Sequence, residues 1–233
     1  MPNELLLIIN LILVYGGILV FYRFFSGNGL IALSAVATVL ANIEVMILID
    51  AFSLEQTLGN VMFASTFLIT DILSETEGQE RANLAVNIGI AVSVFFILAS
   101  QLWLLYTPSE NDWAFSSFVT LFTNTPRIVI SGFVVYAIVQ KVDVFLYHRW
   151  WRLTEKKTGD RRRLLWLRNN GSTIISQLLN AVLFNLLAFW GRYDTSTLVT
   201  IIASTFAIYL VITVLGTPAV YLARRISENR GEK

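Results

Sequence analysis

The sequence has no cysteine, only one histidine and few charged residues. Without cysteine there are no disulfides, thiolate nucleophiles or sulfur-ligated metals, and His148 alone cannot assemble a histidine-based metal site. Only 14% of the 233 residues are charged, whereas soluble domains carry about 25%. No HExxH, Gly-x-Ser-x-Gly or nucleotide-binding motif occurs, so we expect no cofactor and no ATP-driven step within this chain. Together with long apolar runs, this composition predicts an integral membrane protein.

Seven apolar segments are candidate membrane spans, because a span needs about 20 mainly apolar residues. The third segment is short, so either the other helices shield it or it enters the bilayer only partly. The fifth begins either near Phe118 or at Pro126, and in the second case it runs to about Tyr147 after a short outer helix. We predict an all-α polytopic bundle of about seven transmembrane helices, six core helices plus an extra N-terminal one, in a single domain of residues 1–233. The segments are 5–22, 30–49, 58–74, 84–106, 118–140, 172–190 and 197–222.

The distribution of basic residues predicts the orientation. Residues 141–168 hold nine of the 17 Lys and Arg residues, whereas the connections around Asp50 and around Glu110 hold none. Because Lys and Arg accumulate in cytoplasmic loops, seven spans place the N-terminus outside and the C-terminus inside. The sequence then has a basic cytoplasmic loop at 141–171 and a cytoplasmic tail at 223–233. We interpret the loop as a contact with anionic membrane lipid rather than with nucleic acid.

Polar residues inside the apolar segments are the candidates for a functional site. The segment 58–74 contains Asn60 and Asp71, and Glu75 follows at its edge. Each unpaired polar atom in hydrocarbon costs on the order of several kcal/mol, so this segment must face protein, water or a ligand. Asp71 and Glu75 are four residues apart and therefore share one helix face. The alternative is a carboxylate pair solvated at the cytoplasmic end of the helix, which suits Glu75 better than Asp71.

Other segments add amides and charges. Asn42 and Glu44 are two residues apart and cannot share a helix face, and Glu44 either pairs with another helix or meets substrate. Arg127 is the one basic residue that the topology does not explain. It is either the counter-ion of a buried carboxylate or an interfacial arginine that reaches the outer headgroups. A polar stripe on the sixth segment either joins two helices or lines a cavity; it comprises Asn169, Thr173, Ser176 and Asn180, with Gln177 beside it.

Amides, carboxylates and one arginine among many aromatic residues suit a planar, hydrogen-bonding solute. Carboxamides and carboxylates bind both the donor and acceptor edges of a heterocycle, and aromatic rings stack on its faces. A transporter is therefore our first hypothesis. An intramembrane enzyme with Asp71 and Glu44 as acid and base lacks a supporting motif. A retinal-linked sensor would need a lysine in the last span, which has none.

Five stretches of the sequence resemble the queuosine precursor transporter family, also called the vitamin uptake transporter family. The resemblance extends from about residue 40 to residue 222, and the pairing of TDILSE with RNNGSTIISQ is its most specific part. It implies a multi-pass inner-membrane transporter of 7-deazaguanine bases such as preQ0 and preQ1, salvaged for tRNA modification. The stretches are ANIEV at 41–45, LGNVMFASTFLITDILSE at 58–75, PRI at 126–128, RNNGSTIISQ at 168–177 and AFWG at 188–191.

Three positions depart from the family pattern. The family usually has Asp where this chain has Asn180, often has Lys at Tyr209 and often has Asp at Gly216. Three ionisable groups are thus neutral here, so a different vitamin-like heterocycle is the alternative solute. We expect a small heterocyclic substrate and membrane lipid as partners, no nucleic acid, and either a monomer or a homodimer. The predicted substrate-binding residues are Asn42, Glu44, Asn60, Asp71, Glu75, Arg127, Asn170, Gln177 and Asn180.

Overall fold

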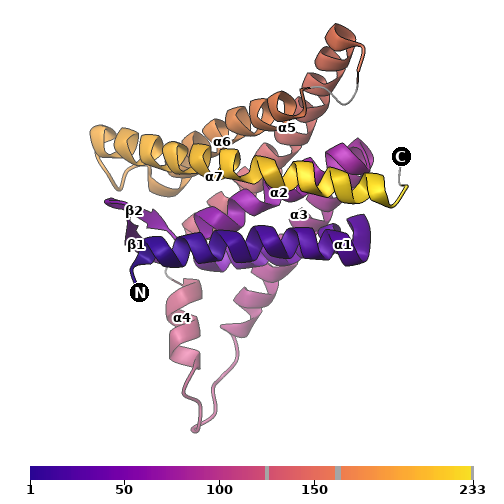
Figure 1. The fold of residues 1–233 in the computed structure, drawn as a ribbon. Coiled ribbons are helices and arrows are strands. Elements are labelled where there is room, and N and C mark those ends of the chain that lie inside the picture. Colours follow the sequence, from indigo (N-terminus) through magenta and orange to yellow (C-terminus); the bar gives the residue numbers. More distant parts are fainter. Residues whose placement is uncertain (124–125, 161–163, 232–233) are drawn as a thin grey trace.

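The structure, a computed structural model, describes residues 1–123, 126–160 and 164–231. Over these residues the chain forms a helical bundle with one small two-stranded sheet, which confirms the predicted helical architecture (Figure 1). Apolar segments form helices because a helix satisfies its own backbone hydrogen bonds, as a lipid environment requires. In chain order the elements are α1 (Asn3–Glu44), β1 (Leu48–Ala51), β2 (Leu54–Thr57), α2 (Gly59–Thr76), α3 (Gln79–Trp103), α4 (Phe115–Thr123), α5 (Pro126–Thr158), α6 (Leu165–Phe189) and α7 (Thr195–Asn229).

Helix α1 consists of two antiparallel helical segments that meet at Ser26. Ser26 has a φ of 54° and a ψ of −150°, which interrupts the helix. The side-chain amide of Asn3 donates a hydrogen bond to the carbonyl oxygen of Asp50 at 2.8 Å, so α1 begins and ends at the same end of the bundle. The bend therefore lies between the first two predicted segments, 5–22 and 30–49.

The predicted helical end at residue 49 is wrong. Helix α1 ends at Glu44, and an antiparallel β-hairpin follows in which Asp50 lies opposite Glu55. Phe52 and Ser53, which join the strands, both have positive φ angles of 54° and 61°. Two such residues form the tight turn whose twist matches the twist of paired strands. This small sheet departs from the all-α prediction, as does an isolated bridge between Trp190 and Tyr193, and it lies at one end of the bundle.

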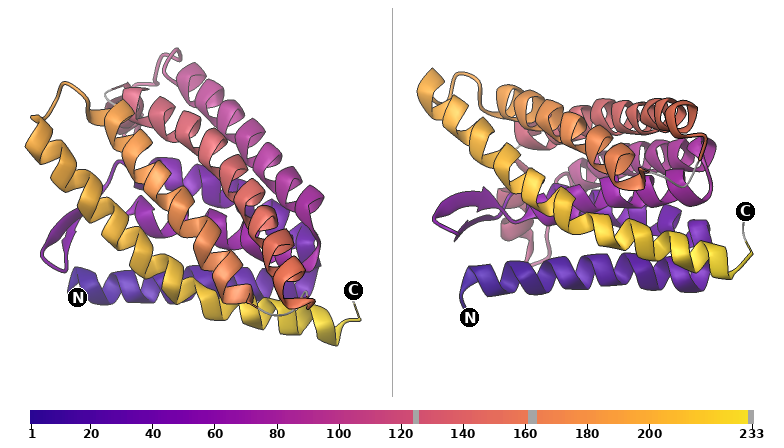
Figure 2. Two further views of the ribbon diagram at one scale, coloured as in Figure 1. Left: turned by 90° about the horizontal axis from the view of Figure 1, so that it is seen from above. Right: turned by 45° about the horizontal axis from the view of Figure 1, so that its top comes forward.

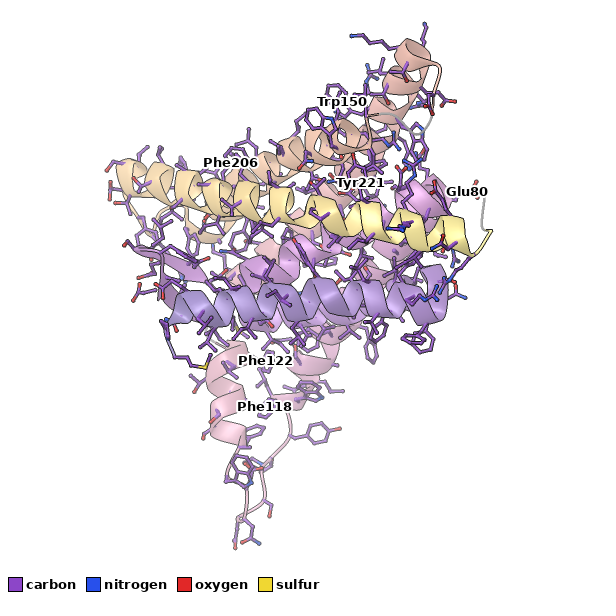
Figure 3. The ribbon with its side chains drawn as sticks, viewed as in Figure 1. Glu80, Phe118, Phe122, Trp150, Phe206 and Tyr221 are labelled. Carbon is purple, nitrogen blue, oxygen red and sulfur yellow. The ribbon has the colours of Figure 1, made fainter. Side chains whose placement is uncertain are left out.

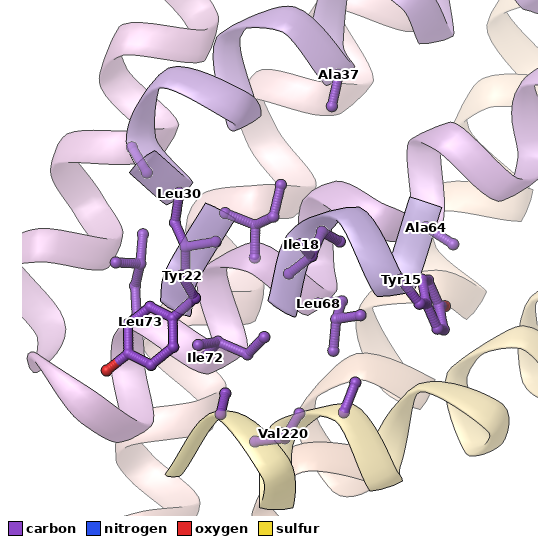
Figure 4. Packing of buried hydrophobic residues seen from close by; sticks show 14 of the residues in the cluster. Tyr15, Ile18, Tyr22, Leu30, Ala37, Ala64, Leu68, Ile72, Leu73 and Val220 are labelled. Atoms are coloured by element: carbon purple, nitrogen blue, oxygen red, sulfur yellow. The ribbon is translucent and has the colours of Figure 1, made fainter. Parts of the chain in front are cut away.

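Helix α2 lies at the centre of the bundle, and 14 of its 18 residues are buried. It contacts α1, α3, α5 and α7. Figure 4 shows Leu68, Ile72 and Leu73 of α2 among Tyr22 of α1 and Val220 of α7, which belong to the same apolar cluster. Of the two alternatives for the short third segment, the structure therefore has the one in which other helices shield it.

The fifth predicted segment begins at Pro126, after the short helix α4, as in the second alternative. The region 141–171, predicted as a basic loop, is instead mostly helical, because α5 continues to Thr158 and α6 begins at Leu165. Lys and Arg are good helix formers, so a basic composition does not end a helix. Figure 3 shows Trp150 on this extended part of α5, on the opposite side of the bundle from α4. The predicted tail is also largely helical, since α7 continues to Asn229.

Charged side chains lie at both ends of the bundle. The N-terminus, the β-hairpin and the α6–α7 connection lie at one end, and the C-terminus lies at the other (Figures 1 and 2). At this second end Arg230 donates a hydrogen bond to Ser26 at 2.6 Å, and Arg81 forms an ion pair with Glu77 at 2.9 Å. At the first end Asp194 caps α7, and hydrogen bonds from nearby hydroxyls and a backbone amide hold the pKa of this carboxyl below its usual range.

Five of the described helices, α1, α3, α5, α6 and α7, are long and apolar enough to cross a membrane. Their outer surfaces expose large apolar side chains, for example Leu13 and Phe95, which are 71% and 72% exposed. A soluble protein would bury most such side chains, whereas lipid accepts them. The chain is thus a multi-pass membrane protein.

Candidate functional site

A cavity of about 200 Å³ lies between the helices near the end that bears the β-hairpin. Helices α1, α2, α5, α6 and α7, the hairpin and the α6–α7 connection all contribute to its wall. The volume lies below the range of about 300–1,000 Å³ that is typical for drug-sized ligands, so the cavity suits a molecule of one or two rings. The residues that carry the argument below are Asn42, Asn60, Phe63, Tyr136, Asn180, Asn185 and Tyr209.

Three asparagines in the wall present hydrogen-bonding groups to the cavity. Asn42 and Asn185 each donate from Nδ2 to a carbonyl of their own helix at 2.8 Å, and neither Oδ1 has a partner among the described residues. Asn180 faces the Tyr209 hydroxyl, and its carboxamide makes no hydrogen bond of ordinary geometry to a described residue. The wall therefore offers acceptors on two sides and a complete carboxamide, both donor and acceptor, on a third.

Aromatic rings form a second part of the wall. Phe63 of α2 lies 6.3 Å from Tyr136 of α5 and 6.2 Å from Tyr209 of α7, measured between ring centroids. Phe184 and Phe189 of α6 also line the cavity. Aromatic faces attract flat, polarisable rings in stacked or edge-on contacts. A planar heterocycle with donors and acceptors on its edges is the ligand that such a wall fits best.

Below the cavity, a column of buried polar groups continues toward the other end of the bundle. Thr66 lines the cavity and accepts a hydrogen bond from Nε2 of Gln140 at 2.5 Å. The hydroxyl of Thr70, one turn farther along α2, lies 3.3 Å from Oε1 of the same glutamine. Asp71 follows and accepts a hydrogen bond from Thr173 of α6 at 2.9 Å. All of these residues are 3% exposed or less, so the column is enclosed by protein.

A cluster of charges closes this column at the far end. Glu75 of α2 forms two short contacts with the guanidinium of Arg168, at 2.9 and 2.6 Å, and a third with Arg224 at 3.3 Å. The Tyr147 hydroxyl donates to the same carboxylate at 2.7 Å, and Arg168 also lies over the ring of Trp151. A bidentate, buried arginine–carboxylate pair has a defined geometry as well as a strong attraction. The cluster therefore ties α2, α5, α6 and α7 together where the column ends.

The structure brings together three of the predicted site residues in the cavity: Asn42, Asn60 and Asn180. Asp71 and Gln177 lie outside its wall, buried in the region below. The placement of Asn60 depends on the hairpin, because its Oδ1 accepts a hydrogen bond from Thr57 at 3.2 Å.

The other four predicted residues do not line the cavity. Glu75 is held in the charge cluster with its side chain 3% exposed, so the solvated alternative is wrong for it. Asn170 exchanges hydrogen bonds with Thr217 of α7 at 2.9 and 3.1 Å and so joins two helices. Glu44 is the last residue of α1 and is only half-buried.

Arg127 is not the counter-ion of a buried carboxylate, and that interpretation is wrong. Its guanidinium donates to the carbonyl oxygens of Leu187 and Trp190, at 2.7 and 2.8 Å, and its side chain is exposed. These carbonyls lie at the C-terminal end of α6, where the last backbone acceptors have no helical partner and a positive charge is favourable. Arg127 thus caps α6 at the end of the bundle where the cavity lies.

Sequence reasoning missed Asp143, which is fully buried on α5. The predicted span 118–140 ended three residues too early, so Asp143 was counted with the basic loop. The signal was available in the alternative span to Tyr147, because Gln140, Asp143 and Tyr147 follow one another at spacings of three and four on one helix face. An acidic residue inside a span marks a functional-site candidate.

A polar cavity inside a bundle of apolar, membrane-spanning helices is the arrangement of a small-solute membrane transporter. The comparisons with known proteins specify this class further. Residues 57–223 match a family model described as "Putative vitamin uptake transporter", so the chain belongs to this family. A relative from Bacillus subtilis (strain 168), named "Probable queuosine precursor transporter", is 33% identical over 212 residues, which cover 91% of this chain and 90% of the relative. No solved structure gives a significant match.

Proposed function

We propose that this protein imports queuosine precursors, that is, 7-deazaguanine bases such as preQ0 and preQ1, and that these bind in the cavity. The observation that supports this most strongly is a cavity of carboxamides and aromatic rings inside a membrane bundle that belongs to this family. A 7-deazaguanine base is flat, with N–H donors and a carbonyl acceptor on its edges. The name of the Bacillus subtilis relative agrees with this solute class.

In this proposal the free Oδ1 atoms of Asn42 and Asn185 accept hydrogen bonds from the ring and exocyclic N–H groups of the base. Asn180 then pairs with both a donor and an acceptor on the base, as a carboxamide does with a heterocycle edge. Phe63 provides the aromatic surface for one face of the ring. Since these asparagines are buried, a solute lacking one of these groups would leave a polar atom unpaired, which selects against it.

We further propose seven spans with the N-terminus outside the inner membrane, which makes the cavity face outward. The basic residues at the opposite end, among them Arg81 and Arg230, support this orientation. Transport then requires the charge cluster around Glu75 to separate, so that the column opens to the cytoplasm while the hairpin end closes. Imported base would be used for tRNA modification.

The test is uptake of labelled preQ0 and preQ1 by cells that cannot synthesise them and that express this chain. Asn185→Leu removes one of the proposed acceptors from the cavity wall, and Asn111→Leu makes the same change in an exposed connection as the matched control. An unpaired buried polar group costs about 1–3 kcal/mol, so KM should rise about 5- to 150-fold in Asn185→Leu, where an N–H of the base loses its acceptor. Asn111→Leu should transport like the intact chain.

Two outcomes would contradict the proposal. If the intact chain reaches the membrane and takes up neither base, the solute class is wrong, and other vitamin-like heterocycles become the candidates because of the neutral Asn180, Tyr209 and Gly216. If both asparagine variants transport normally, the cavity is not the binding site, although the solute class stands.

A further inference from the structure

Two buried carboxyl groups lie next to each other below the cavity, Asp71 of α2 and Asp143 of α5. They are 3% and 0% exposed, respectively. Neither forms an ion pair with a described residue, in contrast to Glu75, whose charge two arginines balance. The Oδ1 of Asp71 and both carboxyl oxygens of Asp143 lack hydrogen bonds of ordinary geometry to the described residues.

Unpartnered neutral groups surround this pair. Ser176 of α6 faces Asp143, is fully buried, and its hydroxyl makes no hydrogen bond to a described residue. Gln177 is 1% exposed and neither atom of its carboxamide has a described partner. Because Gln177 is four residues after Thr173 and three before Asn180, it lies on the same helix face, between the Asp71 contact and the cavity. The region is thus a polar site with unused acceptors and donors, and its polar side chains continue along α6 toward the cavity.

Two adjacent carboxylates in such a place cannot both stay ionised at a moderate cost, because burial and mutual repulsion both oppose the second charge. One proton shared between them removes a charge and gives one carboxyl group a donor for the other. We infer that Asp71 and Asp143 together bind the proton whose inward movement drives solute import. This inference rests on the proposed function, since it names the energy source of the same transporter.

The titratable and charged groups around the pair define how it would titrate. Helix α2 itself contributes Glu75, α1 contributes Tyr15 and α5 contributes Tyr147. The cations nearest along the column, from α6 and α7, are Arg168 and Arg224, which bind Glu75. Helix α3 presents no charged side chain to the pair among the described contacts.

The position of the pair couples the proton to the solute. A proton enters from the cavity side, past Gln177, and binds while the charge cluster keeps the far end closed. Once solute is bound and the cluster separates, water from the cytoplasm reaches the pair and the shared proton leaves to it. Both carboxylates are then ionised, and the pair takes up the next proton when the cavity side opens again. One proton crosses for each turnover in this scheme, so a gradient of one pH unit supports about tenfold accumulation of a neutral solute.

The experiment uses purified protein in liposomes with labelled preQ0, whose side chain is uncharged, and with the membrane potential held at zero. Two activities are measured: exchange of labelled for unlabelled preQ0 without a gradient, and accumulation when the outside is one pH unit more acidic. Asp143→Asn should keep exchange and lose accumulation. Asp50→Asn, the same change on an exposed carboxylate of β1, should keep both.

Measurements on the intact chain keep the inference testable if Asp143→Asn does not fold. Addition of preQ0 to liposomes without a gradient should make the outside more alkaline, because protons move inward with the solute. Infrared spectra of the intact chain should contain the carbonyl band of a protonated carboxylic acid at neutral pH, independently of any substrate.

Accumulation driven by a sodium gradient and not by the pH gradient would overturn the inference and make the pair a sodium site. Exchange without any pH-driven accumulation, or unchanged accumulation in Asp143→Asn, would also overturn it. Failure of the intact chain to exchange any 7-deazaguanine contradicts the proposed function instead. In that case the infrared band alone tests the proton site, and the absence of the band overturns the inference.

Discussion

The charge cluster around Glu75 leads to a quantitative prediction about stability. Arg168→Gln should destabilise the protein much more than Arg224→Gln, although both arginines bind the same carboxylate. The Arg168 side chain is 0% exposed and makes two contacts with Glu75, at 2.9 and 2.6 Å. The Arg224 side chain is 17% exposed and makes one contact at 3.3 Å.

The expected magnitudes follow from this difference. Loss of one partner of a buried ion pair costs about 3–5 kcal/mol, because the remaining charge stays buried without compensation. A partly exposed single contact contributes only about 0.2–1 kcal/mol. In domains of 150–250 residues, 1 kcal/mol corresponds to about 2–4 °C in Tm. Arg168→Gln should therefore lower Tm by about 6–20 °C, and Arg224→Gln by no more than about 4 °C.

Thermal unfolding in detergent, followed by intrinsic tryptophan fluorescence, measures both shifts. The chain has six tryptophans, and Trp151 lies 4.5 Å from the Arg168 guanidinium, so the signal reports on this region. A double variant with Glu75→Gln should recover part of the stability, because it removes the uncompensated charge. Equal shifts for the two arginine variants, or no recovery in the double variant, would refute the reasoning.

Three further predictions concern the cavity and the orientation. Asn180→Asp places a carboxylate in the cavity and should raise the preference for the amine-bearing preQ1 over preQ0 at least about tenfold in competition uptake; an unchanged preference would remove Asn180 from the site. In Gly89→Ala the new methyl group would collide with the tyrosine of α5 that lines the cavity, so KM should rise, whereas Gly16→Ala, which meets nothing within 4 Å, should not change it. In this cysteine-free chain, an impermeant thiol reagent should label Thr195→Cys but not Lys157→Cys in intact cells, and the reverse pattern would invert the proposed orientation.

Most of the helical framework could be predicted from hydropathy, because long apolar runs have few stable alternatives in a bilayer. The start of α5 at Pro126 was one of two alternatives, and the preference of proline for the first turn of a helix supported it. The end of α1 could not be predicted, because residues 45–49 are as apolar as the helix before them. The chain leaves the helix there to form the hairpin, a choice made by strand pairing and by the turn at Phe52 and Ser53.

The candidate site was predictable as a set of polar residues but not as an arrangement. Asn42, Asn60 and Asn180 belong to three helices, and only the packing of those helices shows that they share a cavity. An acidic residue inside a span is a site candidate, and this rule applies to Asp143 as it does to Asp71. Asp143 is not among the predicted site residues because the predicted span ends at residue 140. The role of Arg127 was not readable either, because its partners are backbone carbonyls of α6 and leave no pattern in the sequence.

Helix α2 explains why the polar groups of this protein lie where they do. It is not among the helices that are long and apolar enough to cross a membrane by themselves, since it contains Asn60, Thr66, Thr70 and Asp71. A helix with such groups is stable in a bilayer only if other helices surround it, so its polarity requires the central position. The same polarity then brings partners from α5 and α6 to its surface, including Gln140 at Thr66. Cavity, carboxyl pair and charge cluster therefore follow one another along a single helix, and a movement of α2 against its neighbours would change all three together.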